Sequence, residues 1–295
     1  MQLIDGITVA EKVHEETRTG IVALSSRGLR PGLAVVLVGN QLASRVYVRK
    51  KAEQCIKLGF HSLRLELPDT VTQQELIAHI AVLNADPKIH GILVQSPTPP
   101  HINEIEVVHT IDPRKDVDGL HPVNVAKLAL EDPSGLVPCT PLGCRRLLLE
   151  YQVPISGAHA VILGRSRIVG KPLSLLLMSK GAGGNATVTV VHSRTRNLEK
   201  ITCQADILIS AIGRPHFLSG RHVCEGAVVI DVGINRVECP GTQSGYRLVG
   251  DANFKQVAPK CSLITPSPGG VGPMTIAMLL SNTVKACRQI HGLPL

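Results

Sequence analysis

Short apolar runs that alternate with amphipathic stretches are the feature that most constrains the fold of this chain. The runs are rich in β-branched residues and continuous rather than alternating in polarity, which is typical of parallel strands covered on both faces. The expected strands are Leu33–Val38, Gly91–Gln95, Ala160–Leu163, Ala186–Val191, Asp206–Ala211 and Ala227–Asp231. The expected helices are Val9–Ser25, Gln41–Leu58, Thr72–Asn84 and Met274–Ile290. This alternation predicts an α/β protein built on doubly wound parallel sheets.

The length of 295 residues suggests two domains. The stretch Asp132–Pro141 is rich in proline and glycine and is the expected exit from the first domain, with a helix beginning near Pro141. We therefore expect an α/β domain over residues 1–141 and a Rossmann-like, doubly wound domain over residues 142–274. The C-terminal helix, residues 275–295, is expected to return to the first domain.

The positive charge is concentrated in the second half of the chain. Residues 1–141 carry 14 Lys and Arg against 16 Asp and Glu, whereas residues 142–295 carry 17 against 7, so the net charges are −2 and +10. The longest basic run is only Arg49–Lys51. The chain has 3 Tyr, 3 Phe and no Trp, which are too few platforms for base stacking. We therefore expect no nucleic-acid partner.

Cysteine spacing and hydropathy indicate the cellular compartment of the protein. The eight cysteines include no Cys-x-x-Cys pair, which argues against a zinc ribbon or a redox dithiol and favours reduced thiols. No apolar run approaches the ~18–20 residues of a membrane span. The N-terminus has no basic region followed by an apolar stretch, so no secretory signal is expected. These features predict a cytoplasmic protein without a membrane partner.

A strand followed by a glycine-bounded turn indicates a dinucleotide site in the second half. The strand Ala160–Leu163 leads into Gly164, and Gly170 opens the next helix, with Ser166 where the middle glycine of G-x-G-x-x-G would stand. Gly164 would permit the tight turn and Gly170 the close packing of helix on strand, and free N–H groups of the helix would face a pyrophosphate. An ordinary β–α turn is an equally good interpretation of this pattern alone.

The end of the following strand indicates which dinucleotide. A free ribose 2′-OH calls for an acidic residue there, but His192–Arg196 contains none. With Arg165 and Arg167, this basic segment favours a 2′-phosphate, and therefore NADP over NAD. The alternative is a solvated basic loop.

Chemistry-bearing side chains of the first half lie on one helix and in two loops. Ser44, Tyr47 and Lys51 share a helix face, where burial could lower the pKa of the lysine, although a solvated face is the alternative. Gln95 ends a strand before a proline-rich loop, a usual ligand position in α/β sheets. Asp116 and Asp118 stand two residues apart and fit either a site or an Asx turn; no His/Cys set accompanies them, so no metal is expected.

Six ordered motifs together resemble one enzyme family, the bifunctional methylenetetrahydrofolate dehydrogenase/methenyltetrahydrofolate cyclohydrolases. The resemblance runs from about Leu3 to Ala286. The motifs are Tyr47-x-x-x-Lys51, Val94-Gln95-x-Pro97, Lys115-Asp-Val-Asp-Gly119, Gly164-Arg-Ser-x-x-Val-Gly170-x-Pro172, Asp231-Val-Gly-Ile-Asn235 and Pro268-Gly-Gly-Val-Gly-Pro-Met-Thr275.

The resemblance implies two reactions in one cleft. NADP⁺ would accept a hydride from 5,10-methylenetetrahydrofolate, and water would open the resulting 5,10-methenyl cation to 10-formyltetrahydrofolate. It also implies a catalytic, folate-binding first domain and a homodimer formed through the cofactor domains. A monofunctional dehydrogenase and a non-catalytic NADP-binding regulator are the alternatives. The presence of both Lys51 and Gln95 disfavours the first, and the intact motif residues disfavour the second.

The resemblance also assigns roles to individual residues. The implied catalytic residues are Lys51, Tyr47, Gln95 and Asp118, with Gln95 bonded to Lys51. The implied substrate-binding residues are Tyr47, Ser44, Asp116, Asp118, Pro268, Gly269, Gly270 and Thr275. The implied cofactor-binding residues are Gly164, Arg165, Ser166, Gly170, Ser193, Arg194, Gly233 and Ile234.

The chain departs from the family pattern in the lining expected for folate. Ser96 and Thr98 stand where leucines are usual, and Ser267 stands where valine is usual. No catalytic group is lost by these changes. Ser193 is the residue type of NADP-using members, which agrees with the absence of an acid in that loop.

Overall fold

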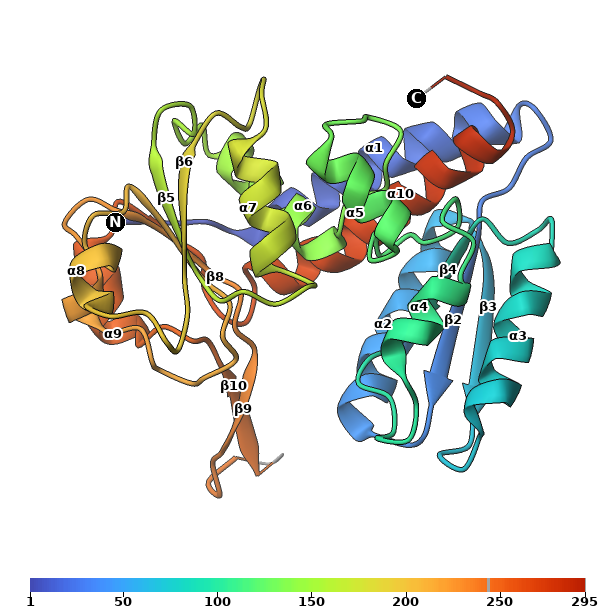
Figure 1. Cartoon of the computed structure of the whole chain (residues 1–295), viewed down its shortest axis with the longest axis horizontal. Coiled ribbons are helices and arrows are strands. Elements are labelled where there is room, and N and C mark those ends of the chain that lie inside the picture. The colour runs from blue at the N-terminus through green and yellow to red at the C-terminus, as the bar shows by residue number, and fades with distance from the viewer. Residues whose placement is uncertain (243–244, 295) are drawn as a thin grey trace. The chain divides into compact units, whose positions relative to one another are not determined.

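The computed structural model describes residues 1–242 and 245–294, and only the backbone at residues 42–44, 46 and 47. The chain divides into two compact units (Figure 1). The six-stranded unit comprises Met1–Glu11 and Thr140–Thr275, and the three-stranded unit comprises Lys12–Cys139 and Ile276–Leu295.

The six-stranded unit is built on a parallel sheet with the strand order β1-β11-β8-β7-β5-β6. Its strands are β1 (Gln2–Leu3), β5 (His159–Leu163), β6 (Thr187–Val191), β7 (Ile207–Ser210), β8 (Val228–Asp231) and β11 (Leu263–Ile264). An antiparallel hairpin adds β9 (Asn235–Glu238) and β10 (Tyr246–Val249). The helices are α6 (Cys139–Glu150), α7 (Gly170–Met178), α8 (Leu198–Thr202) and α9 (Phe254–Val257), with 3-10 turns at Gly220–His222 and Ala258–Lys260. Aliphatic side chains of the central strands, such as Leu208 and Val229, form its core.

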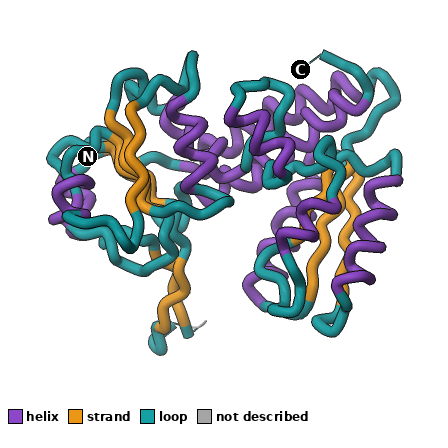
Figure 2. The backbone as a smooth tube through the Cα atoms, in the orientation of Figure 1, coloured by secondary structure: helices purple, strands orange, loops and turns teal. Residues whose placement is uncertain are grey.

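The three-stranded unit has the parallel order β3-β2-β4, with helices on both sides of the sheet (Figures 1 and 2). Its elements are β2 (Gly32–Val38), α2 (Leu42–Leu58), β3 (His61–Leu67), α3 (Gln73–Ala85), β4 (Gly91–Val94), α4 (Glu104–Thr110) and α5 (Pro122–Ala129). Most of α1 (Gly6–Ser25) and α10 (Val271–Ile290) also belong to this unit. Every residue of β2 is buried, as its unbroken apolar run requires.

Strand register brings particular loops together at the carboxyl edge of each sheet. In the three-stranded sheet Val36 of β2 pairs with Val94 of β4, so Gln95 leaves the sheet beside the end of β2. In the six-stranded sheet Leu163 of β5 pairs with Val191 of β6, so the loops that begin at Gly164 and His192 are neighbours. Ligands of open α/β sheets bind at this edge.

The six predicted strands and four predicted helices are confirmed, with ends that shift by a few residues. The α/β class and the parallel sheets are confirmed as well. All eight cysteines, each among the described residues, are free thiols. Within the part of the chain that the structure describes, no helix has the length and apolar character needed to cross a membrane.

Candidate active site

A buried lysine and an amide meet in the three-stranded unit. Lys51, on α2, is only 6 % exposed, and its Nζ donates to Oε1 of Gln95 at 3.0 Å. The backbone N–H of Gln95 donates to the Val36 carbonyl at 2.8 Å, and its Nε2 donates to the Ser96 carbonyl at 2.7 Å. The amide is therefore oriented from both ends, with its oxygen toward the lysine.

Burial shifts the proton equilibria of the charged groups around Lys51. Burial lowers the pKa of Lys51, and the nearby Asp118 carboxylate acts in the opposite sense. Burial likewise raises the pKa of Asp118, while Lys51 favours its ionised form. The lysine is thus closer to neutrality than an exposed lysine would be, with a carboxyl group as its neighbour.

Two further residues near Lys51 and Asp118 could not be found from the sequence. The Cys139 thiol lies 3.2 Å from the Val117 carbonyl oxygen and adjoins the Asp118 carboxylate, and burial raises the pKa of this thiol well above its usual value. Asn282 of α10 donates from Nδ2 to the carbonyls of Val117 and Val137 at 2.9 and 2.8 Å. Neither residue belongs to a recognisable motif, so only the folded chain reveals that they hold the segment around Asp118.

Asp116 and Lys115 stabilise the loop that carries Asp118. The Asp116 carboxylate is 1 % exposed and accepts from Leu120 N, His121 N and Asn124 Nδ2 at 2.8–3.2 Å. Lys115 donates from Nζ to three carbonyl oxygens at the end of α3. These hydrogen bonds favour a structural role for Asp116 over the expected contact with substrate. They reach residues 120, 121 and 124, which lie farther along the chain than the i+2 contact of an Asx turn.

Two of the expected site residues lie where only the backbone is described. Ser44 and Tyr47 belong to the first turns of α2, two turns and one turn before Lys51, respectively. Their side chains are outside the described part of the structure, so their expected roles remain predictions.

The loop after β5 has the backbone that the glycine spacing predicts. Gly164 has φ of +126°, a conformation that favours glycine, and a Cβ there would collide with the Ala211 carbonyl. A Cβ on Gly170 would collide with the carbonyl of Gly164 itself. The two glycines thus allow the loop to fold back tightly against the start of α7.

The expectation of free N–H groups at the start of α7 is wrong. Ser166 Oγ accepts from Val169 N and Gly170 N at 3.1 and 3.4 Å, and the Ser166 carbonyl accepts from Lys171 N at 3.1 Å. Proline at 172 has no N–H. Across residues 169–172, all of them described, the helix start is capped by the loop itself, which leaves the exposed residues 165–168 to offer donors to a phosphate.

The basic groups expected for NADP lie at the shared edge of β5 and β6. Arg165 and Arg167 are exposed after β5, and Ser193 and Arg194 are exposed after β6. The β6 loop is shaped internally, because His192 N donates to Thr195 Oγ1 at 2.9 Å. An edge that presents guanidinium groups and no carboxylate fits the extra phosphate of NADP.

Two buried carboxylates shape the turn that holds Gly233 and Ile234. Asp231 accepts from Gly233 N and Ala252 N, both at 2.9 Å. Asp251 is 0 % exposed and accepts from Ile212, Gly213 and Arg214 N–H groups and from Asn235 Nδ2 at 2.8–3.2 Å. Sequence reasoning treated Asp231 only as part of a motif and missed Asp251, which joins three loops of the six-stranded unit.

The glycine-rich loop before α10 is tied to the Gly233 turn. Ser267 Oγ donates to the Gly233 carbonyl at 2.7 Å, so one departure from the family pattern makes a defined contact. Pro268 is exposed, Gly270 is buried, and the Gly269 carbonyl accepts from Gly6 N at 3.1 Å. At the end of the motif, Thr275 Oγ1 lies 3.0 Å from Thr140 Oγ1.

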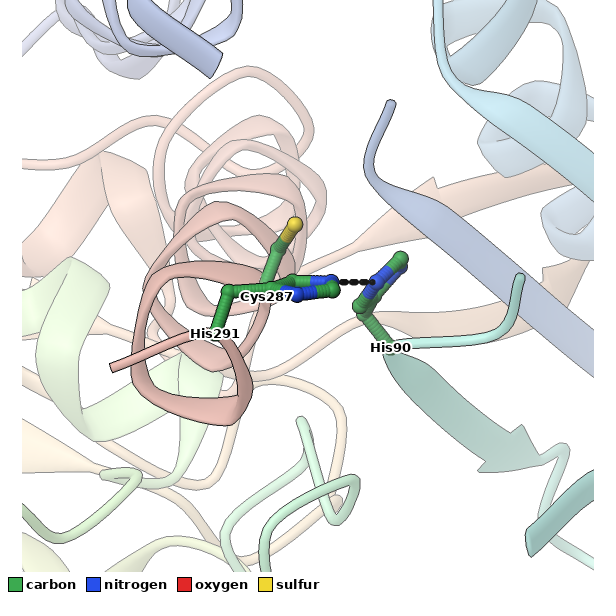
Figure 3. Close-up of side chains that lie close together, drawn as sticks. All are labelled: His90, Cys287 and His291. Carbon is green, nitrogen blue, oxygen red and sulfur yellow. Dashed lines mark hydrogen bonds between the residues drawn. The ribbon is translucent and has the colours of Figure 1, made fainter. Parts of the chain in front are cut away.

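A second cluster of ligand-type side chains comprises His90, Cys287 and His291 (Figure 3). The N–H of Gly32 donates to His90 Nδ1 at 3.0 Å, which leaves the proton of a neutral ring on Nε2. Burial and the neighbouring His291 lower the pKa of His90 to about 4, so the ring is neutral near pH 7. His90 Nε2–H therefore donates to His291 Nε2 at 3.2 Å, and this proton occupies the position that a metal ion would need.

The two units define a dinucleotide-dependent α/β enzyme with a buried lysine in its site. Residues 4–118 match the family model of the tetrahydrofolate dehydrogenase/cyclohydrolase catalytic domain, and residues 138–291 match that of the tetrahydrofolate dehydrogenase/cyclohydrolase NAD(P)-binding domain. The chain belongs to the tetrahydrofolate dehydrogenase/cyclohydrolase family.

Curated relatives and solved structures match along the whole chain. The bifunctional protein FolD of Prosthecochloris aestuarii is 50 % identical over 295 residues, covering 99 % of this chain and 100 % of the relative. FolD of Campylobacter concisus is 52 % identical over 288 residues and 98 % of both chains. The crystal structure of Campylobacter jejuni FolD has a TM-score of 0.92 at 46 % identity, covering 98 % of this chain and 99 % of its own.

A further structure bears on the cofactor. The Trypanosoma brucei dehydrogenase-cyclohydrolase, complexed with NADP and an inhibitor, has a TM-score of 0.91 at 40 % identity over 98 % of both chains. The bifunctional expectation is confirmed: the chain is an NADP-dependent methylenetetrahydrofolate dehydrogenase and methenyltetrahydrofolate cyclohydrolase.

Proposed function

We propose that Lys51 handles the proton in the hydrolysis of 5,10-methenyltetrahydrofolate and that Gln95 orients it. The observation that carries this proposal is the hydrogen bond from the buried Lys51 Nζ to Gln95 Oε1 at 3.0 Å. An amine that is neutral part of the time is a general base, and it does not repel a cationic substrate. The Asp118 carboxyl group beside it compensates charge when the amine takes up a proton.

The proposed hydrolysis moves one proton through Lys51. As water adds to the cationic methenyl carbon, a C–O bond forms and Lys51 Nζ accepts a proton from the water. The bond from this carbon to N5 then breaks with its electron pair going to N5, which takes up a proton. The added oxygen loses its remaining proton to solvent as the C=O of the formyl group forms on N10. The protonated Lys51 is the proton donor for that second step, so the amine returns to its starting state.

We also propose which residues would bind NADP and folate. Bound NADP⁺ supplies the hydride acceptor for the oxidation step. Residues that would hold it are Gly164, Arg165, Ser166, Gly170, Ser193, Arg194, Gly233 and Ile234. Residues that would contact folate are Ser44, Tyr47, Asp118, Pro268, Gly269, Gly270 and Thr275. Their support is the loop geometry described above for every member except Ser44 and Tyr47, which rest on the family resemblance.

The domain roles and the assembly are also proposals. We assign folate binding and catalysis to residues 1–141 with helix 275–295, and NADP binding to residues 142–274. The family resemblance supports a homodimer formed through the cofactor domains and a cytoplasmic location. Tetrahydrofolate one-carbon derivatives are the proposed small-molecule partners, with no nucleic-acid partner.

Substitution of Lys51 tests the proposed role. Lys51→Met should lower the rate of methenyltetrahydrofolate hydrolysis at least ~100-fold, the usual contribution of a positioned general base. Lys50→Met is the matched control, because Lys50 is the exposed neighbour on the same helix and should hydrolyse at the wild-type rate. Absorbance assays would follow authentic methenyltetrahydrofolate for hydrolysis, and methylenetetrahydrofolate with NADP⁺ and then NAD⁺ for oxidation. Normal hydrolysis by Lys51→Met would overturn the role.

A further inference from the structure

The turn that follows β4 is held by one carboxylate oxygen. Glu104 Oε1 accepts from Ser96 Oγ at 2.9 Å, from Thr98 N at 2.9 Å and from Thr98 Oγ1 at 3.3 Å. Pro97 and Pro99 have no N–H, so Thr98 supplies the only backbone donor of residues 97–99. That donor and both hydroxyl groups of the turn therefore converge on Glu104.

Glu104 is itself anchored by contacts away from the turn. It is the first residue of α4, whose N-cap Asn103 accepts from Ile105 N at 3.1 Å. Asn103 N donates to Gln73 Oε1 at 2.9 Å, and Val107 is buried in the core between α3 and the sheet. The backbone of Glu104 is thus held in place, and its carboxylate in turn holds the turn formed by Ser96 and Thr98.

The same turn carries the amide that orients Lys51. Gln95 Oε1 accepts from Lys51 Nζ at 3.0 Å, while Gln95 Nε2 donates to the Ser96 carbonyl at 2.7 Å. The orientation of the amide therefore depends on the position of that carbonyl, and Ser96 is bonded through its hydroxyl to Glu104. A continuous path of hydrogen bonds runs from Glu104 through Ser96 and Gln95 to Lys51.

We propose that Glu104 is a positioning residue for hydrolysis, acting on Lys51 through the Ser96–Thr98 turn and Gln95. The inference rests on the proposed role of Lys51. The inference explains the hydroxyl groups of Ser96 and Thr98 in the turn, because the side chain of leucine at either position has no group that donates to a carboxylate.

Substitution of Glu104 tests this inference. Glu104→Ala should lower kcat for methenyltetrahydrofolate hydrolysis roughly ten-fold with little change in KM, below the ~100-fold that a 1 Å misplacement can cost. Glu104→Gln keeps an oxygen acceptor of the same reach and should recover most of that loss. Glu106→Gln, on the same helix and exposed, is the control for loss of a carboxylate charge and should retain wild-type kcat, because the amide keeps an oxygen acceptor for Gln73 Nε2.

A double-mutant cycle separates a specific path from a general loss of structure. Ser96→Ala with Thr98→Val should lower kcat about three-fold in the wild-type background, and should have no further effect in Glu104→Ala, because contacting residues are energetically coupled. Additive losses, or a Glu104→Ala variant with wild-type kcat, would overturn the inference. If Glu104→Ala fails to fold, the Ser96→Ala/Thr98→Val variant of the wild type is the test. An unchanged kcat in that variant would contradict the inference.

The Lys51→Met result distinguishes this inference from the proposed function. Loss of hydrolysis in Lys51→Met together with wild-type kcat in Glu104→Ala would remove only the positioning role. Normal hydrolysis in Lys51→Met would remove the proposed role of the lysine, whatever the result at Glu104.

Discussion

At the scale of single residues, two buried lysines are used in different ways. Burial lowers the pKa of both Lys51 and Lys115. Lys115 donates to three backbone carbonyl oxygens at 2.7–3.2 Å, and hydrogen bonds of this kind favour the charged form of the amine against the effect of burial. Lys51 donates to a single amide oxygen, at Gln95. An amine with one neutral acceptor gives up its proton more easily, so Lys51 is suited to proton transfer and Lys115 to structure.

The carboxyl group of Asp231 allows a test by pH. Burial, with a smaller contribution from Asp251, raises the pKa of Asp231 to about 6 from its ordinary 3.8. A raised folded-state pKa stabilises the fold below pH ~4, and this contribution of about 3 kcal/mol is lost as the pH rises through 6. The stability cost of Asp231→Asn, which does not titrate, should therefore shrink between pH 4 and pH 7. Urea unfolding of both proteins across this range measures it; a cost that does not change would contradict the shifted pKa.

At the scale of elements, the end of α3 depends on a side chain from a distant loop. Lys115 Nζ bonds the carbonyls of Leu83, Asn84 and Asp86 at the helix end, where the last carbonyls have no intrahelical partner. The Asp86 carbonyl also accepts from Ile89 N at 3.2 Å. Lys115→Met should lower the free energy of unfolding by about 2–4 kcal/mol, since buried acceptors lose their partner. Lys88→Met, exposed beside the same helix end, should change it by less than ~0.5 kcal/mol. Denaturant unfolding of the wild type and both variants measures these changes. A Lys115→Met variant as stable as Lys88→Met would exclude this capping role.

Elements were predictable where their sequence pattern reflects burial. The run Leu33–Val38 is apolar because β2 is covered on both faces. The edge strand β3 has the alternating sequence HSLRLEL and was not predicted, because only part of its surface is covered. The hairpin of β9 and β10 was missed for the same reason, since most of its residues are not buried.

The candidate site was predictable only where its residues stand in ordered motifs. Lys51 and Gln95 could be paired from the family resemblance, and the structure places them in hydrogen-bond contact. Cys139, Asn282 and Glu104 enter through tertiary contacts, and no local spacing records which side chains a fold brings together. The prediction of free N–H groups at the start of α7 was wrong for a related reason. The sequence indicates that a helix begins there, but not that the Ser166 side chain accepts from its first N–H groups.

At the scale of the whole molecule, the net charge of +8 divides into −2 over residues 1–141 and +10 over residues 142–295. The guanidinium groups of Arg165, Arg167 and Arg194 account for part of this excess, at the edge where an anionic dinucleotide is proposed to bind. A field of this sign attracts anions over about a Debye length, and salt screens it. The charge distribution should therefore be visible in the salt dependence of cofactor use.

Cofactor affinity should fall with salt, and more for NADP⁺ than for NAD⁺. Raising the salt concentration from about 0.1 M to about 1 M shortens the Debye length from about 10 Å to about 3 Å. KM for NADP⁺ should then rise several-fold more than KM for NAD⁺, because only NADP⁺ carries the 2′-phosphate. Arg194→Ala should raise KM for NADP⁺ roughly ten-fold at low salt, as expected for a lost guanidinium–phosphate pair. It should also reduce the salt dependence, whereas Arg247→Ala, exposed on β10, should change neither. Equal salt dependence for the two dinucleotides in the dehydrogenase assay would show that the positive charge serves something other than the 2′-phosphate.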